Sequence, residues 1–221
     1  DENILQGYLC ISAKSLARKQ AQMASLIQQS FLTLRFDELT RIKDIIEQNH
    51  SRKQQSITGS GHALAMTCAS QTLAPIAKLN ELFSGMSSIV KSGELEKQAQ
   101  CSEGLKKLAE ELQALHQKIS ACEKRLLSIS EQSYQQAISG ELQNLWRDAG
   151  NNDSHFAIET KAQAAQEAWV CNSQVNFCAK AYKTVPTGHK DSAALTVLGG
   201  FLRNGFLHTA IREKGGAYGG G

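Results

Sequence analysis

Residues 105–122, LKKLAEELQALHQKISAC, carry the most regular periodic pattern in the chain. Apolar side chains recur at spacings of 3, 4, 3, 4 and 3 residues, which is the period of an amphipathic α-helix. The apolar positions are Leu105, Leu108, Leu112, Leu115, Ile119 and Cys122. A coiled coil needs a longer run of heptads than the one found here. The spacing therefore favours a helix that lies on a sheet or on other helices.

Helical patterns extend to both sides of this segment. The predicted helices cover residues 15–33, 37–57, 62–86, 95–122, 131–148 and 192–214, and PTGHKD at 186–191 is a predicted turn before the last of them. TGSG at 58–61 and KSGE at 91–94 are the expected breaks between them, because glycine and serine favour turns. Pro75 is expected to kink the third helix or to start a new one.

Strand-like alternation appears between and after these helices. The predicted strands cover residues 7–13, 124–130 and 167–185, and a last one begins at Gly216. Residues on both faces of the first strand are fairly apolar, so we expect it to be covered on both sides. The order of elements indicates an α+β fold that is rich in helices, with antiparallel sheets covered on one face by helices.

The chain divides at a polar, turn-forming segment. Residues 149–166 are predicted to be a linker between a domain at 1–148 and a second at 167–221. The second part is small for an independent domain, and its last predicted strand is unfinished. We therefore expect the chain to be a fragment of a larger protein.

Composition excludes several classes of protein. The chain has 221 residues and a net charge of +3, without a basic run that alternates with aromatic residues, so nucleic acid is not an expected partner. No apolar stretch approaches the ~20 residues of a membrane span, and the acidic start DENILQGYLC does not resemble a signal peptide. The six cysteines are scattered, so we expect reduced and mostly buried thiols rather than a disulfide framework.

Local motifs for familiar catalytic centres are missing from the sequence. No two of the six histidines lie within five residues of each other, so the sequence contains neither H-E-x-x-H nor its inverted form. G-x-S-x-G is absent, and GGAYGGG at 215–221 lacks the Lys and Ser/Thr of a phosphate-binding loop. We expect no metal ligands in this chain.

The last residues, IREKGGAYGGG at 211–221, combine an arginine, a tyrosine and a run of glycines. A structural interpretation accounts for the first part: Arg212 suits the last turn of a helix, and Gly215 and Gly216 suit its end. That interpretation does not explain the glycines after Tyr218, because glycines in a strand cost backbone entropy and pack no side chain. They are useful where another backbone, such as a bound peptide, must approach closely.

Residues 175–186, VNFCAKAYKTVP, and 191–221 resemble the final domain of the pitrilysin/insulinase-type zinc metallopeptidases. FLHTAIREKGGAYGGG at 206–221 is most similar to the presequence protease branch. Residues 1–148 fit more loosely, as the second part of the third domain of that family. The resemblance implies an enzyme of four related α+β domains, similar to those of mitochondrial processing peptidase, around a closed chamber. It also implies a zinc site on an H-x-x-E-H helix in the first domain, which this chain does not contain.

The resemblance also assigns roles near the end of the chain. Arg212 and Tyr218 match an Arg and a Tyr that reach the substrate beside the zinc and contact its scissile carbonyl in the transition state. His208, Gly216, Gly219 and Gly220 are the implied substrate-binding residues. The implied partners are unfolded peptides and the missing N-terminal half of the same chain, without which we expect no activity.

Two points stay open at this stage. A non-catalytic scaffold or partner-binding subunit on the same fold is the alternative function, in which Arg212 and Tyr218 are structural. The implied location is the cytoplasm of a bacterium or the matrix of a mitochondrion or plastid, and not the outside of the cell.

Overall fold

The computed structural model describes residues 5, 7–146 and 166–220. The chain forms two compact units, one up to Lys180 and one from Ala181 onward. The predicted boundaries at 1–148 and 167–221 remain a prediction, because most of the predicted linker lies outside the described residues.

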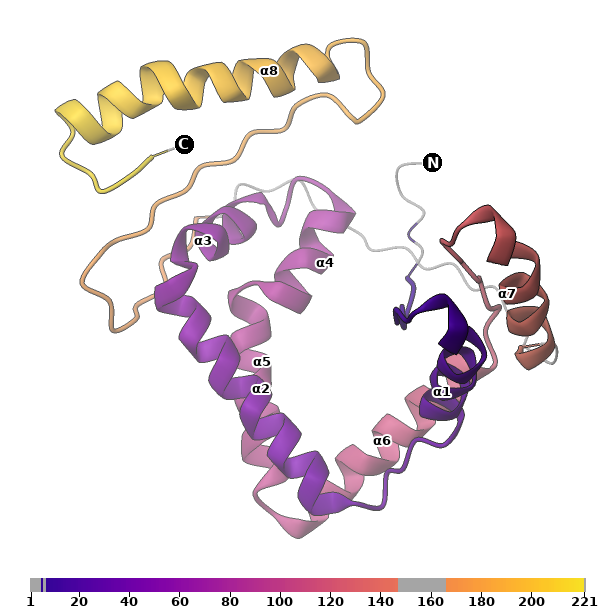
Figure 1. Ribbon diagram of the computed structural model, residues 1–221. Helices are drawn as coiled ribbons and strands as arrows, with labels where there is room; N and C mark the ends of the chain where they lie inside the picture. The colour runs from indigo at the N-terminus through magenta and orange to yellow at the C-terminus, as the bar shows by residue number, and fades with distance from the viewer. Residues whose placement is uncertain (1–4, 6, 147–165, 221) are drawn as a thin grey trace. The chain divides into compact units, whose positions relative to one another are not determined.

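The first unit is built from helices (Figure 1). A short 3-10 helix, Ala17–Lys19, leads into α1, and six further helices follow. Their bounds are α1 Gln20–Leu32, α2 Leu39–Gly59, α3 Gly61–Ser70, α4 Pro75–Ser84, α5 Met86–Ala99, α6 Ser102–Ser120 and α7 Gln132–Leu145. The predicted break at 58–61 is confirmed by Ser60 between α2 and α3, and Pro75 starts a new helix as its first residue.

The main core lies where α2, α5 and α6 meet. Its buried side chains are Ile42, Ala99, Leu105, Leu108 and Ala109. Leu105 and Leu108 belong to the periodic run that predicts α6, whereas Leu112 and Leu115 are exposed. The run therefore packs on two neighbouring helices through its first half, as expected for an amphipathic helix that lies on other helices.

A second cluster joins α1, α6 and α7 through aromatic rings. The Phe31 ring lies 5.1 Å from the His116 ring and 5.7 Å from the Trp146 ring, between centroids. The imidazole Nε2 of His116 lies 2.8 Å from the carbonyl oxygen of Phe31, and the Gln28 amide donates to the carbonyl of Leu145. These contacts attach the ends of α1 and α7 to the last third of α6.

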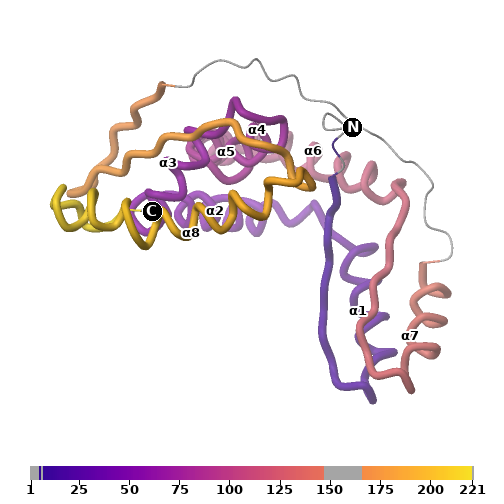
Figure 2. The backbone as a smooth tube through the Cα atoms, turned by 90° about the horizontal axis from the view of Figure 1, so that it is seen from above, coloured from indigo at the N-terminus to yellow at the C-terminus, as the bar shows by residue number. Residues whose placement is uncertain are grey.

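The predicted α+β fold is wrong for the described residues, which contain no strand and no sheet. Residues 7–13, 124–130, 167–185 and 216–220 are not helical either, apart from local turns and bends, and the first two run without helical coils in Figure 2. A segment becomes a strand only when a neighbour exchanges backbone hydrogen bonds with it. Here Leu5 and Cys122 make isolated bridges, and no ladder follows.

Side-chain exposure agrees with this correction. Leu127 and Ile129 are 86% and 91% exposed, so the alternation of residues 124–130 does not face a core. Arg125 donates a hydrogen bond of 2.8 Å to the Tyr8 hydroxyl and stacks on its ring, so these side chains join the two predicted strands. Period-2 alternation correctly indicated segments that are not helical. It did not indicate whether a neighbouring strand pairs with them.

The predicted break at residues 91–94 is also wrong, because α5 runs through it without interruption. Gly93 has a packing role: a Cβ atom on it would lie 3.1 Å from Cε1 of His50 on α2. Glycine within a helix is tolerated where another element needs that space. The actual breaks are Gly85, before α5, and Cys101, before α6.

The cysteines differ from expectation as well. Only Cys68 is buried, Cys122 is half-buried, and Cys10, Cys101, Cys171 and Cys178 are exposed. Apolar character alone does not bury a thiol when its segment lacks a covering element.

The second unit contains one long helical segment (Figure 1). The predicted turn at 186–191 is confirmed, with Gly188 at φ 95°. It leads into α8, Ser192–Leu202, which continues directly as η2, a π-helix over Arg203–Lys214. This unit carries every residue of the predicted substrate site.

Candidate functional site

The candidate site lies around the end of η2 and the segment that follows it. Arg212 is in the last turn, where a cation is favoured by the negative end of the helix dipole. Gly215 follows the helix, and Gly216 has φ +71°, a left-handed conformation that suits glycine. The prediction that Gly215 and Gly216 end the helix is therefore confirmed.

The glycines have different local environments. A Cβ on Gly215 would lie 2.6 Å from the carbonyl oxygen of Ile211, and one on Gly220 would lie 2.8 Å from Cγ2 of the same isoleucine. A Cβ on Gly219 would meet no atom within 4 Å. Glycine is thus required by backbone conformation at 216 and by close approach at 215 and 220. At Gly219 the described residues set no such requirement.

Arg212 and Tyr218 both face open space. The Tyr218 side chain is 96% exposed, and Arg212 is exposed as well. Within the described part of the chain, neither side chain makes a hydrogen bond or an ion pair. A guanidinium and a phenol hydroxyl without internal partners are both free to donate hydrogen bonds to a ligand.

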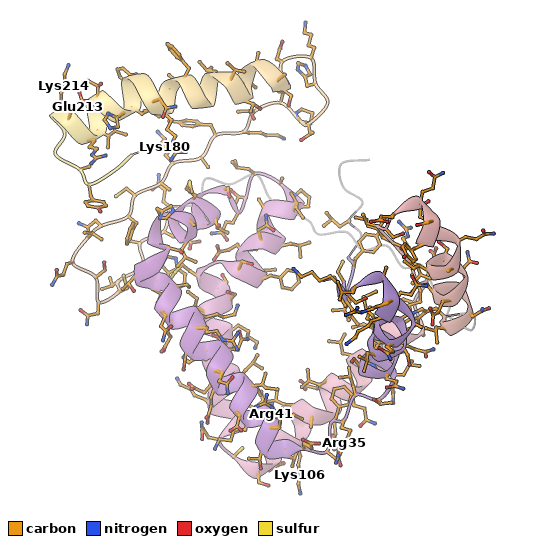
Figure 3. All side chains as sticks on the ribbon, in the orientation of Figure 1. Arg35, Arg41, Lys106, Lys180, Glu213 and Lys214 are labelled. Carbon is orange, nitrogen blue, oxygen red and sulfur yellow. The ribbon has the colours of Figure 1, made fainter. Side chains whose placement is uncertain are left out.

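His208 has a different neighbour from the one that sequence spacing suggests. Its Nδ1 atom lies 3.2 Å from Oε1 of Glu213, five residues later, whereas helical spacing in an α-helix would bring Arg212 closest. Figure 3 labels Glu213 and Lys214 at the end of this helix. Glu213 is therefore a member of the site that sequence reasoning missed. Its contact with His208 follows from the π-helical form of the segment, which the sequence pattern does not indicate.

A separate polar cluster joins α3 to residues 167–169 in the first unit. The Cys68 thiol donates to one oxygen of Glu167 at 3.3 Å, and the Gln71 amide donates to the other at 2.8 Å. The indole of Trp169 and the ammonium of Lys78 complete the network. Burial, followed by the Glu167 carboxylate, raises the pKa of Cys68 to about 11. The thiol is protonated and held in a network, so it is not a nucleophile at neutral pH.

A second buried group lies between α2 and α5. Nδ1 of His50 is 2.8 Å from Oγ of Ser92, and Nε2 is 3.6 Å from Oε2 of Glu96. The three residue types are those of a hydrolase triad, but His50 and Ser92 are buried, and Ser92 donates to the carbonyl of Ile89. Without access for a substrate, this group serves to hold two helices together.

The side chains that commonly bind metal ions are dispersed over the described residues. Among residues 5, 7–146 and 166–220, no three histidine, cysteine, aspartate or glutamate side chains gather as metal ligands. None of the helices in the same ranges is long and apolar enough to cross a bilayer.

Comparison with known proteins agrees with the resemblance found in the sequence. Residues 1–95 match the family described as Peptidase M-16C associated. Over the full chain, the sequence is 27% identical to mitochondrial presequence protease of Danio rerio, and the match covers 24% of that protein. The same enzyme of Drosophila melanogaster is 29% identical over 96% of the chain, and that of Mus musculus is 27% identical over 98%.

These matches confirm the predicted resemblance to the presequence protease branch of the metallopeptidases. The chain spans about a quarter of the length of the curated relatives it matches. All three of these relatives are named as mitochondrial.

Proposed function

We propose that this chain is the C-terminal substrate-chamber portion of a zinc metalloendopeptidase of the presequence protease type, which degrades unstructured peptides in the mitochondrial matrix. The observation that carries the proposal is the similarity of the whole chain to presequence proteases. The free donors at Arg212 and Tyr218 support it, because they match the family positions that contact substrate.

The chain would supply hydrogen-bond donors and chamber wall rather than the reactive centre. The described residues do not fit a zinc site, so zinc would be held by another part of the parent protein. Arg212 and Tyr218 would donate to the scissile carbonyl and, more strongly, to the oxyanion that forms from it. The helices of residues 15–148 would line the chamber.

The glycines would let the peptide backbone approach. Glycine at 216 serves the left-handed backbone and glycine at 220 the close approach of Ile211, whereas Gly219 leaves space open to a ligand. His208 would contact substrate only through the face that Glu213 leaves free. The chain alone would be inactive, and its partners would be peptides and the remainder of the parent polypeptide.

Replacing Tyr218 by Phe tests the proposed role directly. In the complete native polypeptide with zinc, we expect kcat for cleavage of an unstructured peptide to fall about 10²–10³-fold, because one oxyanion donor is lost. Bound zinc should be unchanged. Tyr134→Phe is the matched control, since Tyr134 is an exposed tyrosine on α7, outside the unit that carries the site.

Equal cleavage by wild type and Tyr218→Phe would show that the hydroxyl is not a transition-state donor. Absence of cleavage by both, with zinc bound, would favour a non-catalytic scaffold or partner-binding subunit on the same fold.

A further inference from the structure

The register of η2 is the least common feature of the fold. All twelve residues from Arg203 to Lys214 are in a π-helix, whereas most π-helical structure is a single turn within an α-helix. The hydrogen bonds of a π-helix join residues five apart, so residues five apart lie on the same face. The wide register begins directly after Leu202, the last residue of α8.

The contact between His208 and Glu213 depends on this register. Each residue of an α-helix turns by ~100°, so residues five apart would be separated by ~140° around the axis. His208 and Glu213 could not meet across that angle, yet their side chains lie 3.2 Å apart. In the α register His208 would instead be next to Arg212, another cation when the imidazole is protonated.

The end of the helix is built in the same wide register. The amide of Gly216 donates to the carbonyl of Arg212 at 3.2 Å, and the amide of Ala217 donates to that of Ile211 at 3.1 Å. Both hydrogen bonds span one residue more than those of the Schellman motif that closes an α-helix. The cap and the ion pair therefore favour the same register.

The local sequence does little to oppose the π-helical register. Gly205 lies within η2, and Gly199 and Gly200 lie just before it, so three glycines weaken the preference of this segment for an α-helix. A single side-chain pair can then influence which register is adopted.

We infer that His208 and Glu213 are positioning residues whose side-chain contact holds residues 203–214 in the π-helical register and sets the direction in which Arg212 projects. The inference about Arg212 rests on the function proposed above. The inference about the register does not.

The register can be read in the 221-residue chain by NMR, from scalar couplings across hydrogen bonds that identify the acceptor of each amide. We expect acceptors five residues back in the wild type and in His208→Lys, which places a donor and a positive charge opposite Glu213. His208→Glu repels Glu213 and attracts Arg212 at the α-helical spacing, so acceptors should move to four residues back. Glu213→Gln should shift the ratio of registers toward α by up to about fivefold, the range for an exposed ion pair.

Asp191→Asn is the matched control, because Asp191 forms another His–carboxylate pair in this unit, with His189 at 3.7 Å, outside η2. It should leave the register unchanged. An α register in the wild type, or one register shared by His208→Lys and His208→Glu, would overturn the inference.

Cleavage by the complete native polypeptide then separates this inference from the proposed function. We expect His208→Glu to lower kcat by a larger factor than it raises KM, and to have no further effect in an Arg212→Gln background. If the register shifts and kcat does not fall, the inference about the register stands. The proposed contact of Arg212 with substrate is then refuted.

Discussion

At the scale of single residues, the Glu81 carboxylate fills the space that a side chain at position 85 would need. Glu81 is fully buried on α4, and its Oε1 accepts the amide of Ser87 in the first turn of α5. A Cβ on Gly85 would lie 1.8 Å from the other oxygen of that carboxylate. Glycine at 85 therefore serves close approach, since its φ of −89° is open to any residue. The carboxylate acts as a cap supplied by the preceding helix.

We expect Gly85→Ala to lower the free energy of unfolding of the first unit by about 1–3 kcal/mol, the usual cost of overpacking. The measurement is urea unfolding followed by far-ultraviolet circular dichroism. Gly59→Ala is the control, because a Cβ on Gly59 meets no atom within 4 Å. Equal stability of the two variants would mean that the Glu81 carboxylate moves without cost.

The Cys68 thiol offers a second test at this scale. With a pKa of about 11 against an ordinary value of 9.0, it has roughly a hundredfold less thiolate at about pH 8. Iodoacetamide should therefore modify Cys68 far more slowly than the exposed Cys10, as measured by peptide mass spectrometry. Glu167→Gln should speed the reaction, because it removes a negative charge beside the sulfur. Equal rates at the two cysteines would contradict the assigned network.

The same pKa has a consequence for stability. Because the folded value lies above the unfolded one, the unfolded chain loses this proton first as the pH rises. The contribution of Cys68 to stability is complete below about pH 9 and is lost as the pH rises toward about 11.

At the scale of elements, two glycines inside helices have opposite expected effects. Gly93 on α5 faces the buried His50 ring, whereas Gly140 on α7 has nothing within 4 Å of its would-be Cβ. Alanine is the better helix former by about 0.5–1 kcal/mol, so Gly140→Ala should raise stability by about that amount. Gly93→Ala should lower it by about 1 kcal/mol, because His50 is held by Ser92 and cannot easily move.

Thermal unfolding of both variants, followed by circular dichroism, would check this pair. A stabilising Gly93→Ala would show that α2 and α5 can separate slightly without loss of their hydrogen bond.

The helices were largely predictable because their periodicity is local. The run from Leu105 lies mostly within α6, and the turn at 58–61 and the start at Pro75 correspond to observed boundaries. The strands were not predictable, since a strand depends on a partner that can lie anywhere in the chain. Gly93 misled the prediction for a similar reason, because the residue that explains it is on another helix.

At the scale of the whole molecule, the second unit leaves large apolar side chains uncovered. Val197, Phe201 and Phe206 are 73%, 72% and 69% exposed on α8 and η2. Under the proposed function these residues would be covered in the parent protein. We expect the 221-residue chain to bind the dye ANS and to cleave no peptide, and the complete polypeptide to bind less dye per mole and to cleave. Cleavage by the chain alone, free of contaminating protease, would refute the proposed division of roles.

The sequence by itself determined most of the helical segments, the cap at Gly215 and Gly216, the position of Arg212 in the last turn before that cap, and the family resemblance. Each of these depends on residues close together in the chain. Only the tertiary structure decided that the alternating segments lack a sheet within the described residues, that Glu81 fills the space beside Gly85, and that Cys68 is joined to Glu167. It also decided that His208 meets Glu213 rather than Arg212. Such contacts depend on helix register and on distant partners, and the spacing of residues along a chain specifies neither.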